Sequence, residues 1–243
     1  MNRPRLLFYA VDGLGLGHVT RMLALARAVR RLSPGAEILF LTTSEASHVI
    51  YQEGFAALKL PSRTAASSGG LRGGSWLRLT QTVAWNAVAA FDPHCLIVDT
   101  FAAGTLQELL PILRWPLRKV FVFRAQRKER ATDPFLQRTL ELYDLILVPH
   151  APDSEDVPTP QNTRAVWTGP MLLRDASELL PRLEARRALG LPLQGEIGLF
   201  APGRKSKRAV YAARRKAAPL GANSSLRESM CQIAWLKRRA MSI

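Results

Sequence analysis

Cysteine is scarce in this chain of 243 residues, and no apolar run is long. The two cysteines, Cys95 and Cys231, are far apart, which excludes a disulfide framework and suits a reducing compartment. The first apolar run, residues 6–11, is too short for the core of a signal peptide, and no stretch reaches the length of a transmembrane helix. These absences indicate a globular, cytoplasmic protein.

Acidic residues are also few, 19 against 34 Lys and Arg, and the deficit is uneven. Residues 204–243 hold eleven Lys and Arg and one acid, a net charge of +10. The other 203 residues hold 23 Lys and Arg and 18 Asp and Glu, a net charge of +5. The basic segment has no recognition motif, so nucleic acid is not an expected partner; a basic arm for nucleic acid or an anionic membrane is the alternative.

Two familiar phosphate-binding loops are missing from the glycine-rich stretch 11–21, Val-Asp-Gly-Leu-Gly-Leu-Gly-His-Val-Thr-Arg. Counted from Gly13, the dinucleotide fingerprint requires its third glycine at the position of His18. The expected second strand, 37–42, is not followed by an early acid for a ribose hydroxyl, and no Gly-Lys-Ser/Thr tripeptide follows the glycines. Neither an NAD site nor a P-loop is therefore expected, and no cofactor is implied.

The chain does contain a regular alternation of strands and helices. Residues 5–11 have the length and aromatic content of a buried strand, and residues 19–32 have the apolar period of a helix. The glycines between them therefore belong to a strand-to-helix turn. In open α/β sheets ligands bind at the carboxyl ends of the strands, and a helix N-terminus there favours anions.

The same alternation continues to about residue 170. Further strands are expected at 37–42, 57–60, 95–98, 119–124, 145–148 and 165–170. Helices are expected at 44–53, 76–91, 102–113, 134–142 and 179–189, with a loop at 61–75. This pattern predicts an α/β fold with a Rossmann-like parallel sheet and helices on both faces.

The first loop resembles that of the two-domain (GT-B) glycosyltransferases. It is similar to the branch that contains the peptidoglycan N-acetylglucosaminyltransferase and to related predicted transferases with a Gly-Leu-Gly-His-x-x-Arg loop. The matching residues are Gly13, Gly15, Gly17, His18 and Arg21. The resemblance implies an N-terminal, acceptor-side domain and transfer of a sugar from a nucleotide-sugar donor to a polar or lipid-linked acceptor.

By this resemblance His18 is the catalytic candidate, as a base or as a group that orients the acceptor or the donor phosphate. Sugar transfer requires the acceptor hydroxyl to lose its proton, and a neutral imidazole at a helix start suits that role. The three glycines shape the loop, and Arg21 is a candidate phosphate contact. The structural alternative is that His18 only caps or packs the turn.

A second segment, Asp-Pro-His-Cys-Leu-Ile-Val-Asp-Thr-Phe at residues 92–101, also resembles the family. Asp99 and Thr100 end its strand and are candidates to bind the acceptor, whereas the alternative is that Asp99 caps the following helix. Gly104 in the first turn of that helix and Arg124 after the next strand complete the candidate acceptor- or phosphate-binding residues. No metal site is expected, because the four histidines share no ligand spacing with acids or cysteines.

The sequence predicts three regions: the acceptor-side domain at 1–170, a hinge, helix and first strand of a second domain at 171–203, and a basic, disordered tail at 204–243. The resemblance places donor binding mainly in the second domain. The change of pattern after residue 203 suggests a truncated or frame-shifted reading frame and an inactive product. Two other functions stay open: a sugar-nucleotide epimerase of the same architecture, or a non-catalytic binding fragment.

The helix at 76–91 has two interpretations. Its apolar side chains, with Arg72 and Arg78 beside them, suit peripheral contact with a membrane surface or a lipid acceptor at the inner face of the membrane. The alternative is an ordinary helix that covers a sheet, which is the commoner case and the favoured interpretation.

Overall fold

The computed structural model describes residues 3–11, 16–124, 133–151, 157, 160, 161 and 163–197. These residues fall into two compact units that part between Leu179 and Leu180. The region predicted as 171–203, which should end in the first strand of a second domain, lies outside the described residues from 198 onward, as does the whole segment 204–243.

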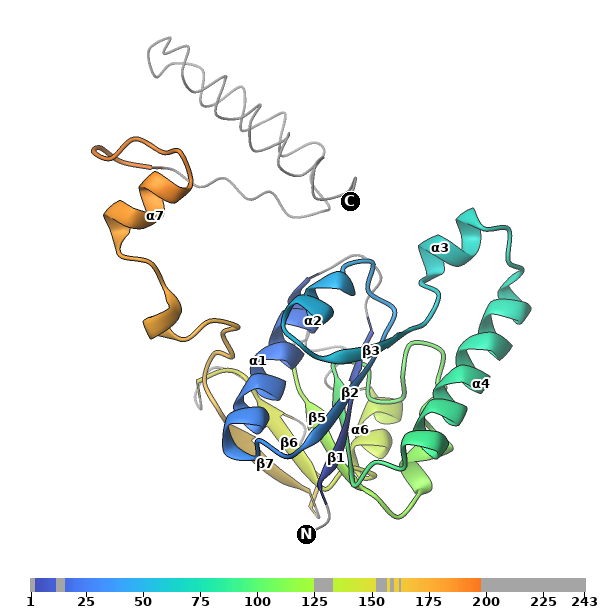
Figure 1. The fold of residues 1–243 in the computed structure, drawn as a ribbon. Coiled ribbons are helices and arrows are strands. Elements are labelled where there is room, and N and C mark those ends of the chain that lie inside the picture. The colour runs from blue at the N-terminus through green and yellow to red at the C-terminus, as the bar shows by residue number, and fades with distance from the viewer. Residues whose placement is uncertain are drawn as a thin grey trace. The chain divides into compact units, whose positions relative to one another are not determined.

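A seven-stranded sheet forms the centre of the first unit (Figure 1), and every neighbouring pair of strands is parallel. Its strand order is β3-β2-β1-β4-β5-β6-β7. The strands are β1 (Arg5–Ala10), β2 (Glu37–Thr42), β3 (Ala56–Lys59), β4 (Cys95–Asp99), β5 (Arg118–Val122), β6 (Leu145–Val148) and β7 (Arg164–Trp167). The predicted α/β fold with a parallel sheet is confirmed.

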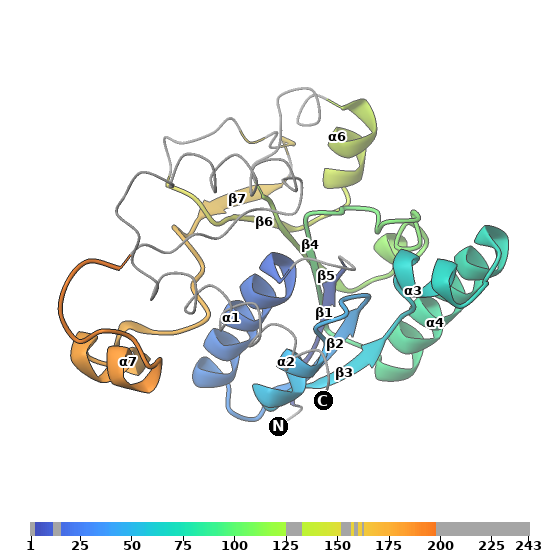
Figure 2. The same cartoon turned by 90° about the horizontal axis from the view of Figure 1, so that it is seen from above.

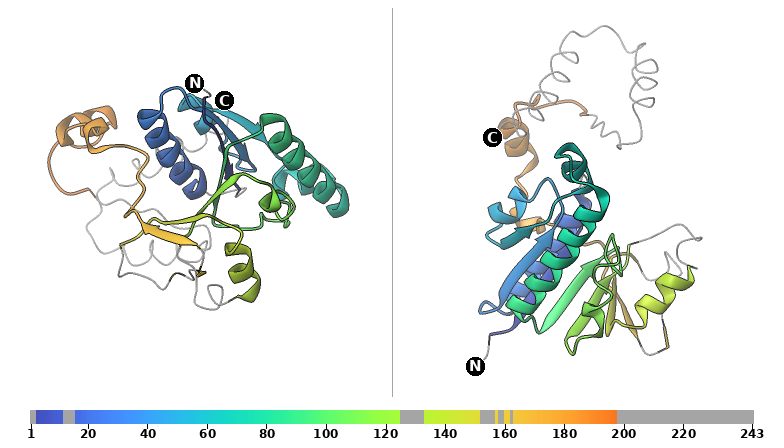
Figure 3. Two further views of the ribbon diagram at one scale, coloured as in Figure 1. Left: turned by 90° about the horizontal axis from the view of Figure 1, so that it is seen from below. Right: turned by 90° about the vertical axis from the view of Figure 1, so that its right-hand side faces the viewer.

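Helices cover both faces of this sheet. They are α1 (Gly17–Leu32), α2 (His48–Gln52), α3 (Arg63–Ser68), α4 (Gly73–Phe91) and α6 (Pro134–Leu140), with short 3-10 turns η1 (Ile112–Arg114) and η2 (Ala176–Glu178). Helices α1 and α2 lie on one side of the sheet, and α4 and α6 lie on the other (Figures 2 and 3).

Successive side chains of a strand point to opposite faces of the sheet, which explains why a helical layer packs on each face. Phe8 and Ala10 of β1 pack in the core cluster with α1, whereas Leu7 and Tyr9 pack in the cluster with α4. All four side chains are fully buried, so the strand appears in the sequence as a continuous apolar run.

The order of strands reverses direction at β1. The chain moves outward from β1 through β2 to β3, then returns to pair β4 with the other edge of β1. The carboxyl ends of β1 and β4 therefore flank the switch point of the sheet, where open α/β folds bind their ligands.

Two predicted local structures are wrong. Residues 61–75, expected as a loop, contain α3 and the first turn of α4. The Ser62 hydroxyl accepts a hydrogen bond from the Ala65 N–H, a cap that starts α3. The helix expected at 102–113 is replaced by turns and η1, with Gly104 and Gln107 at positive φ.

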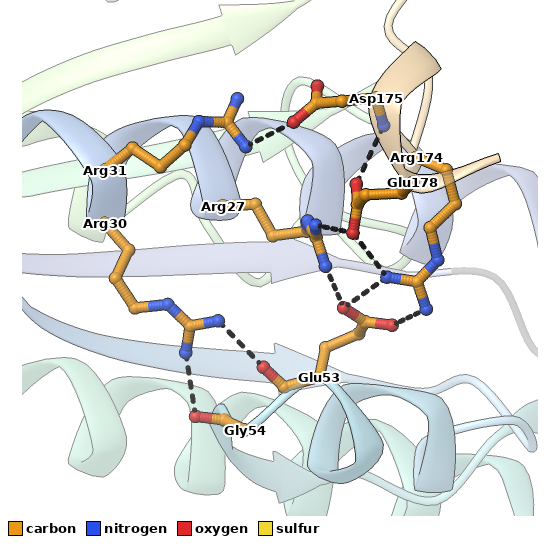
Figure 4. Close-up of polar contacts among 8 residues, drawn as sticks. All are labelled: Arg27, Arg30, Arg31, Glu53, Gly54, Arg174, Asp175 and Glu178. Atoms are coloured by element: carbon orange, nitrogen blue, oxygen red, sulfur yellow. Dashed lines mark hydrogen bonds and ion pairs between the residues drawn. The ribbon is translucent and has the colours of Figure 1, made fainter.

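The segment 171–179 belongs to the first unit, and a network of charged side chains holds it there (Figure 4). Arg27 of α1 lies 2.6 Å from the carboxylate of Glu53, which also binds Arg174. Arg27 binds Glu178 as well. The ion pairs thus join α1, the end of α2 and the segment after β7.

The second unit, in its described part, is organised around α7 (Arg182–Ala188). The buried guanidinium of Arg186 donates hydrogen bonds to the carbonyls of Pro192 at 2.8 Å and Gly195 at 2.7 Å. This closes the turn that follows the helix.

Candidate functional site

The candidate base lies at the switch point. His18 is the second residue of α1, and it is buried. Its Nδ1 atom lies 2.6 Å from Oδ2 of Asp99, the last residue of β4. The two strands that flank the switch point thus bring together two side chains that the sequence analysis selected separately.

Arg21 completes this cluster from the next turn of α1. Its guanidinium nitrogen Nη1 lies 2.7 Å from Oδ1 and 2.9 Å from Oδ2 of Asp99. The Asp99 side chain is fully buried, and that of Arg21 is 16% exposed. A buried carboxylate requires such compensation, because an unpaired charge in the interior is costly.

The charges determine which tautomer of His18 fits. An ionised Asp99 can only accept hydrogen bonds, so the Nδ1 atom of His18 must donate. In the neutral imidazole the Nε2 atom then carries the lone pair. The ring is held further by Phe101, whose centroid lies 5.8 Å away at an interplanar angle of 32°.

The alternative role for Asp99, a cap for a helix at 102–113, is wrong because no such helix forms. The carboxylate faces His18 and Arg21 with no exposed surface. Asp99 therefore acts on its surroundings through these two side chains.

Thr100 adopts an unusual conformation beside Asp99. Its φ of 65° lies in the left-handed region, which costs a β-branched residue about 1–3 kcal/mol. Its N–H donates to the carbonyl of Val122 at 3.1 Å. Its buried hydroxyl has no hydrogen-bond partner within the part of the chain that the structure describes.

A residue that the sequence analysis missed organises the loop after Thr100. The carboxylate of Glu108 is fully buried and accepts hydrogen bonds from the N–H groups of Leu106 at 2.7 Å and Thr105 at 3.2 Å. The hydroxyl of Tyr9 also donates to it. Burial, together with this neighbouring carboxylate, raises the pKa of Tyr9 well above its ordinary value. Nothing in the sequence indicated this role, because Glu108 lies in the segment 102–113, where a helix was expected.

Gly104 is necessary for the same loop. It has a φ of +84°, and a Cβ atom there would lie 2.4 Å from the carboxyl carbon of Glu108. The close approach of the backbone to this carboxylate accounts for glycine at this position, and Gly104 stays a proposed contact for the acceptor or for phosphate.

The other predicted site residues take no part in the contacts among His18, Arg21 and Asp99. Gly17 is the first residue of α1 and has open space around it. Arg124 is exposed two residues beyond β5. Gly13 and Gly15 lie outside the described residues.

Neither a metal-binding cluster nor a membrane-spanning helix is found among the described residues. Among them, no three His, Cys, Asp or Glu side chains gather in a way that could hold a metal ion. No helix among them is both long and apolar enough to cross a membrane.

Comparisons with known proteins agree with the predicted resemblance. No protein-family model matches the sequence. An uncharacterized glycosyltransferase of Methanopyrus kandleri is 39% identical over 75 residues, which are 30% of this chain and 22% of that protein. The chain thus spans well under two thirds of that relative.

Among solved structures, the calicheamicin glycosyltransferase CalG4 superposes with a TM-score of 0.50 at 18% identity, covering 70% of this chain and 52% of CalG4. MurG of Acinetobacter baumannii gives 0.49 at 12% identity, covering 68% and 45%. A putative UDP-N-acetylglucosamine 2-epimerase of Listeria monocytogenes gives 0.43 at 14%, covering 61% and 39%. The CalG4 match shows a shared Rossmann-like fold, so the resemblance to GT-B glycosyltransferases is confirmed at the level of the fold.

Proposed function

We propose that this chain acts in glycosyl transfer from a nucleotide-sugar donor to the hydroxyl group of an acceptor, with His18 as the base. The observation that carries the proposal is the contact of 2.6 Å between His18 Nδ1 and Asp99 Oδ2 at the switch point of the sheet. A histidine oriented by a buried carboxylate is a recurring arrangement for general base catalysis.

The reaction assigns a role to each side chain of the cluster. The acceptor oxygen loses its proton to His18 Nε2 and bonds to the anomeric carbon of the sugar. The bond from that carbon to the phosphate oxygen breaks, and the nucleoside diphosphate leaves with its electron pair. Asp99 stabilises the imidazolium that forms, and Arg21 orients the carboxylate through its two hydrogen bonds.

We assign donor binding mainly to the second domain that the resemblance implies, and we place the protein in the cytoplasm, bound to no metal. Thr100, Gly17 and Arg124, all near carboxyl ends of central strands, are proposed contacts for the acceptor or for phosphate. Gly13 and Gly15 are proposed to shape the loop before His18. Contact with the inner face of the membrane is proposed only through a lipid-linked acceptor.

The test is release of nucleoside diphosphate from a panel of nucleotide sugars, with and without candidate acceptor alcohols. The intact chain should release nucleotide only when an acceptor is present. His18→Ala should lower the rate by about 10²- to 10⁴-fold, the usual contribution of a general base. The matched control is His48→Ala, because His48 is exposed at the start of α2.

Three results would contradict the proposal. Conversion of a nucleotide sugar without any acceptor would identify an epimerase instead. Equal rates for the His18 and His48 variants would exclude His18 as the base. Absence of release with every donor and acceptor pair, both for this chain and for a chain extended by the donor domain that the resemblance implies, would favour a binding function.

A further inference from the structure

The loop after β4, residues 100–109, carries the aromatic ring that packs on the candidate base. It follows Asp99 directly, and the ring centroid of its Phe101 lies 5.8 Å from that of the His18 imidazole. Phe101 and Leu106 of the same loop, together with residues of α3 and α4, line a cavity of about 670 Å³. The position of the 100–109 loop therefore determines what lies against the imidazole.

The first turn of the 100–109 loop is strained. The N–H of Phe101 donates to the carbonyl of Asp99 at 2.7 Å, and Thr100 between them has a φ of 65°. A hydrogen bond across a single residue at positive φ is typical of the classic γ-turn, which is rare and strained. Such a conformation persists only where the surrounding structure holds it, so the loop needs firm contacts further along.

Glu108 supplies these contacts from the far end of the loop. Its fully buried carboxylate accepts hydrogen bonds from the N–H groups of Leu106 at 2.7 Å and Thr105 at 3.2 Å, and the hydroxyl of Tyr9 donates to it as well. Hydrogen bonds to an ionised group are roughly twice as strong as those between neutral groups. A carboxylate therefore fixes this backbone more firmly than an amide would.

Three aromatic side chains from separate parts of the first unit direct their polar atoms at the same loop. Tyr9 comes from β1, and its raised pKa keeps the hydroxyl protonated as a donor. The indole N–H of Trp85 in α4 donates to the main-chain carbonyl of Glu108 at 2.7 Å. The buried hydroxyl of Tyr143 donates to the carbonyl of Ala102 at 2.5 Å. The loop is thus anchored at both ends.

We propose that Glu108 is a positioning residue for proton transfer at His18. It acts through Phe101: the carboxylate holds the 100–109 loop so that the phenyl ring packs on the imidazole and keeps it directed at Asp99. Precise placement of a reacting group matters, because a small displacement caused by a distant residue lowers the rate. The inference rests on the proposed function for the identity of the reaction, but not for the contact that Glu108 maintains.

The first experiment observes this contact in the full chain without donor or acceptor. NMR resonances of the His18 imidazole are assigned by their loss in His18→Ala, and Phe101→Leu shows how they shift when the phenyl ring current is removed. Glu108→Gln should shift them in the same direction, because the ring leaves the imidazole. Glu141→Gln is the matched control at an exposed position after α6 and should leave them in place.

A second pair of variants decides the matter if Glu108→Gln does not fold. Tyr9→Phe removes one hydrogen bond to the carboxylate and retains the buried ring, so it should shift the His18 resonances in the same direction by a smaller amount. Tyr51→Phe is its control, because Tyr51 is exposed and its hydroxyl donates to the carbonyl of Ala57.

The second experiment measures nucleotide release. Glu108→Gln should lower kcat by about 10²-fold, the effect of a misplaced reacting group, and change the KM for the donor little. Phe101→Leu should lower kcat by a similar factor. The double variant should be no slower than the slower single variant, because the two residues act through one contact.

Four results would overturn the inference. They are His18 resonances that do not move in Glu108→Gln, equal shifts in Glu141→Gln, shifted resonances with an unchanged kcat, and losses of rate that multiply in the double variant. Where Glu108→Gln is unfolded, unmoved resonances in Tyr9→Phe would overturn it as well. A chain that releases no nucleotide would contradict the proposed function instead, while the resonances still decide whether Glu108 positions the imidazole.

Discussion

Nδ1 of His18 lies 2.6 Å from Oδ2 of Asp99, although the two residues are 81 positions apart in the sequence. The contact joins the start of α1 to the end of β4, and Arg21 binds the same carboxylate from α1. Because the Asp99 side chain has no exposed surface, its charge is compensated entirely by its protein neighbours. This cluster leads to the first prediction.

Asp99→Asn should lower the rate of transfer by about 10²-fold or more while changing the KM for the acceptor little, because the amide cannot stabilise an imidazolium as a carboxylate does. Nitrogen NMR of the imidazole should show the Nδ1–H tautomer in the parent and a changed tautomer ratio in the variant. Asp92→Asn is the control, since Asp92 is exposed and pairs with Arg5 at the amino ends of β1 and β4, away from the site. An unchanged tautomer and rate would contradict the role of Asp99.

Gly104→Ala should destabilise the chain by about 3 kcal/mol, which combines the left-handed backbone with a clash against the buried carboxylate of Glu108. Gly70→Ala is the matched control, because Gly70 has a φ of +74° but open space around it. The control should lose only about 1 kcal/mol. Urea unfolding followed by circular dichroism measures both, and equal losses would show that the contact with Glu108 is unimportant.

The carboxyl group of Glu53 should account for part of the loss of stability of the fold at low pH. Burial raises the pKa of its carboxyl, but hydrogen bonds from Arg174 and Arg27 outweigh burial and hold that pKa below its ordinary value of 4.5. The contribution to stability is therefore complete above about pH 4.5 and is lost as the pH falls through the lowered pKa of the folded state.

Glu53→Gln should thus cost about 2 kcal/mol at pH 7 and flatten the loss of stability below pH 4.5. Hydrogen exchange at residues 174–178 should become faster, because Arg174 loses its charged partner. Glu141→Gln, at an exposed position after α6, should change neither quantity. A Glu53 variant with the parent's pH profile would exclude this origin of acid sensitivity.

Cys95 should react slowly in the folded chain. Burial and the nearby Asp144 raise the pKa of its thiol to about 11, compared with an ordinary value of 9.0. At pH 8 its thiolate fraction is therefore about a hundredfold lower than that of an ordinary thiol. In a Cys231→Ser background, Ellman's reagent should modify the folded chain at least that much more slowly than the urea-unfolded chain, and equal rates would contradict the prediction.

Local sequence patterns were sufficient for most of the fold. The continuous apolar run of β1 and the period of α1 predicted a strand and a helix. Both formed because β1 buries its side chains in the core clusters on both faces of the sheet and α1 buries its apolar side chains in one of them. The same reasoning failed at residues 102–113, where a helical apolar period is present. There the buried carboxylate of Glu108 takes backbone N–H groups that a helix would have used, and Gly104 and Gln107 bend the chain through positive φ.

The candidate site was predictable only in part. His18, Arg21 and Asp99 were selected because they follow strands, at the edge where α/β sheets bind ligands. Their mutual contacts were not predictable, since they depend on β4 pairing with β1 rather than with β3. The cavity lined by residues of α3 and α4 was not predictable either, because the sequence shows no helical period at residues 61–75 and the Ser62 cap of α3 is seen only in the structure.

The sequence by itself determined the class of fold, the parallel arrangement and the edge of the sheet that carries the site, because burial of periodic apolar residues and glycines in a strand-to-helix turn are local properties. Only the tertiary structure decided that Asp99 orients His18, that Glu108 shapes the neighbouring loop and that Arg63 shares a cavity with Trp76. These relationships join residues that are distant in sequence, and their energies depend on burial and on charge compensation, which exist only once the strands have paired.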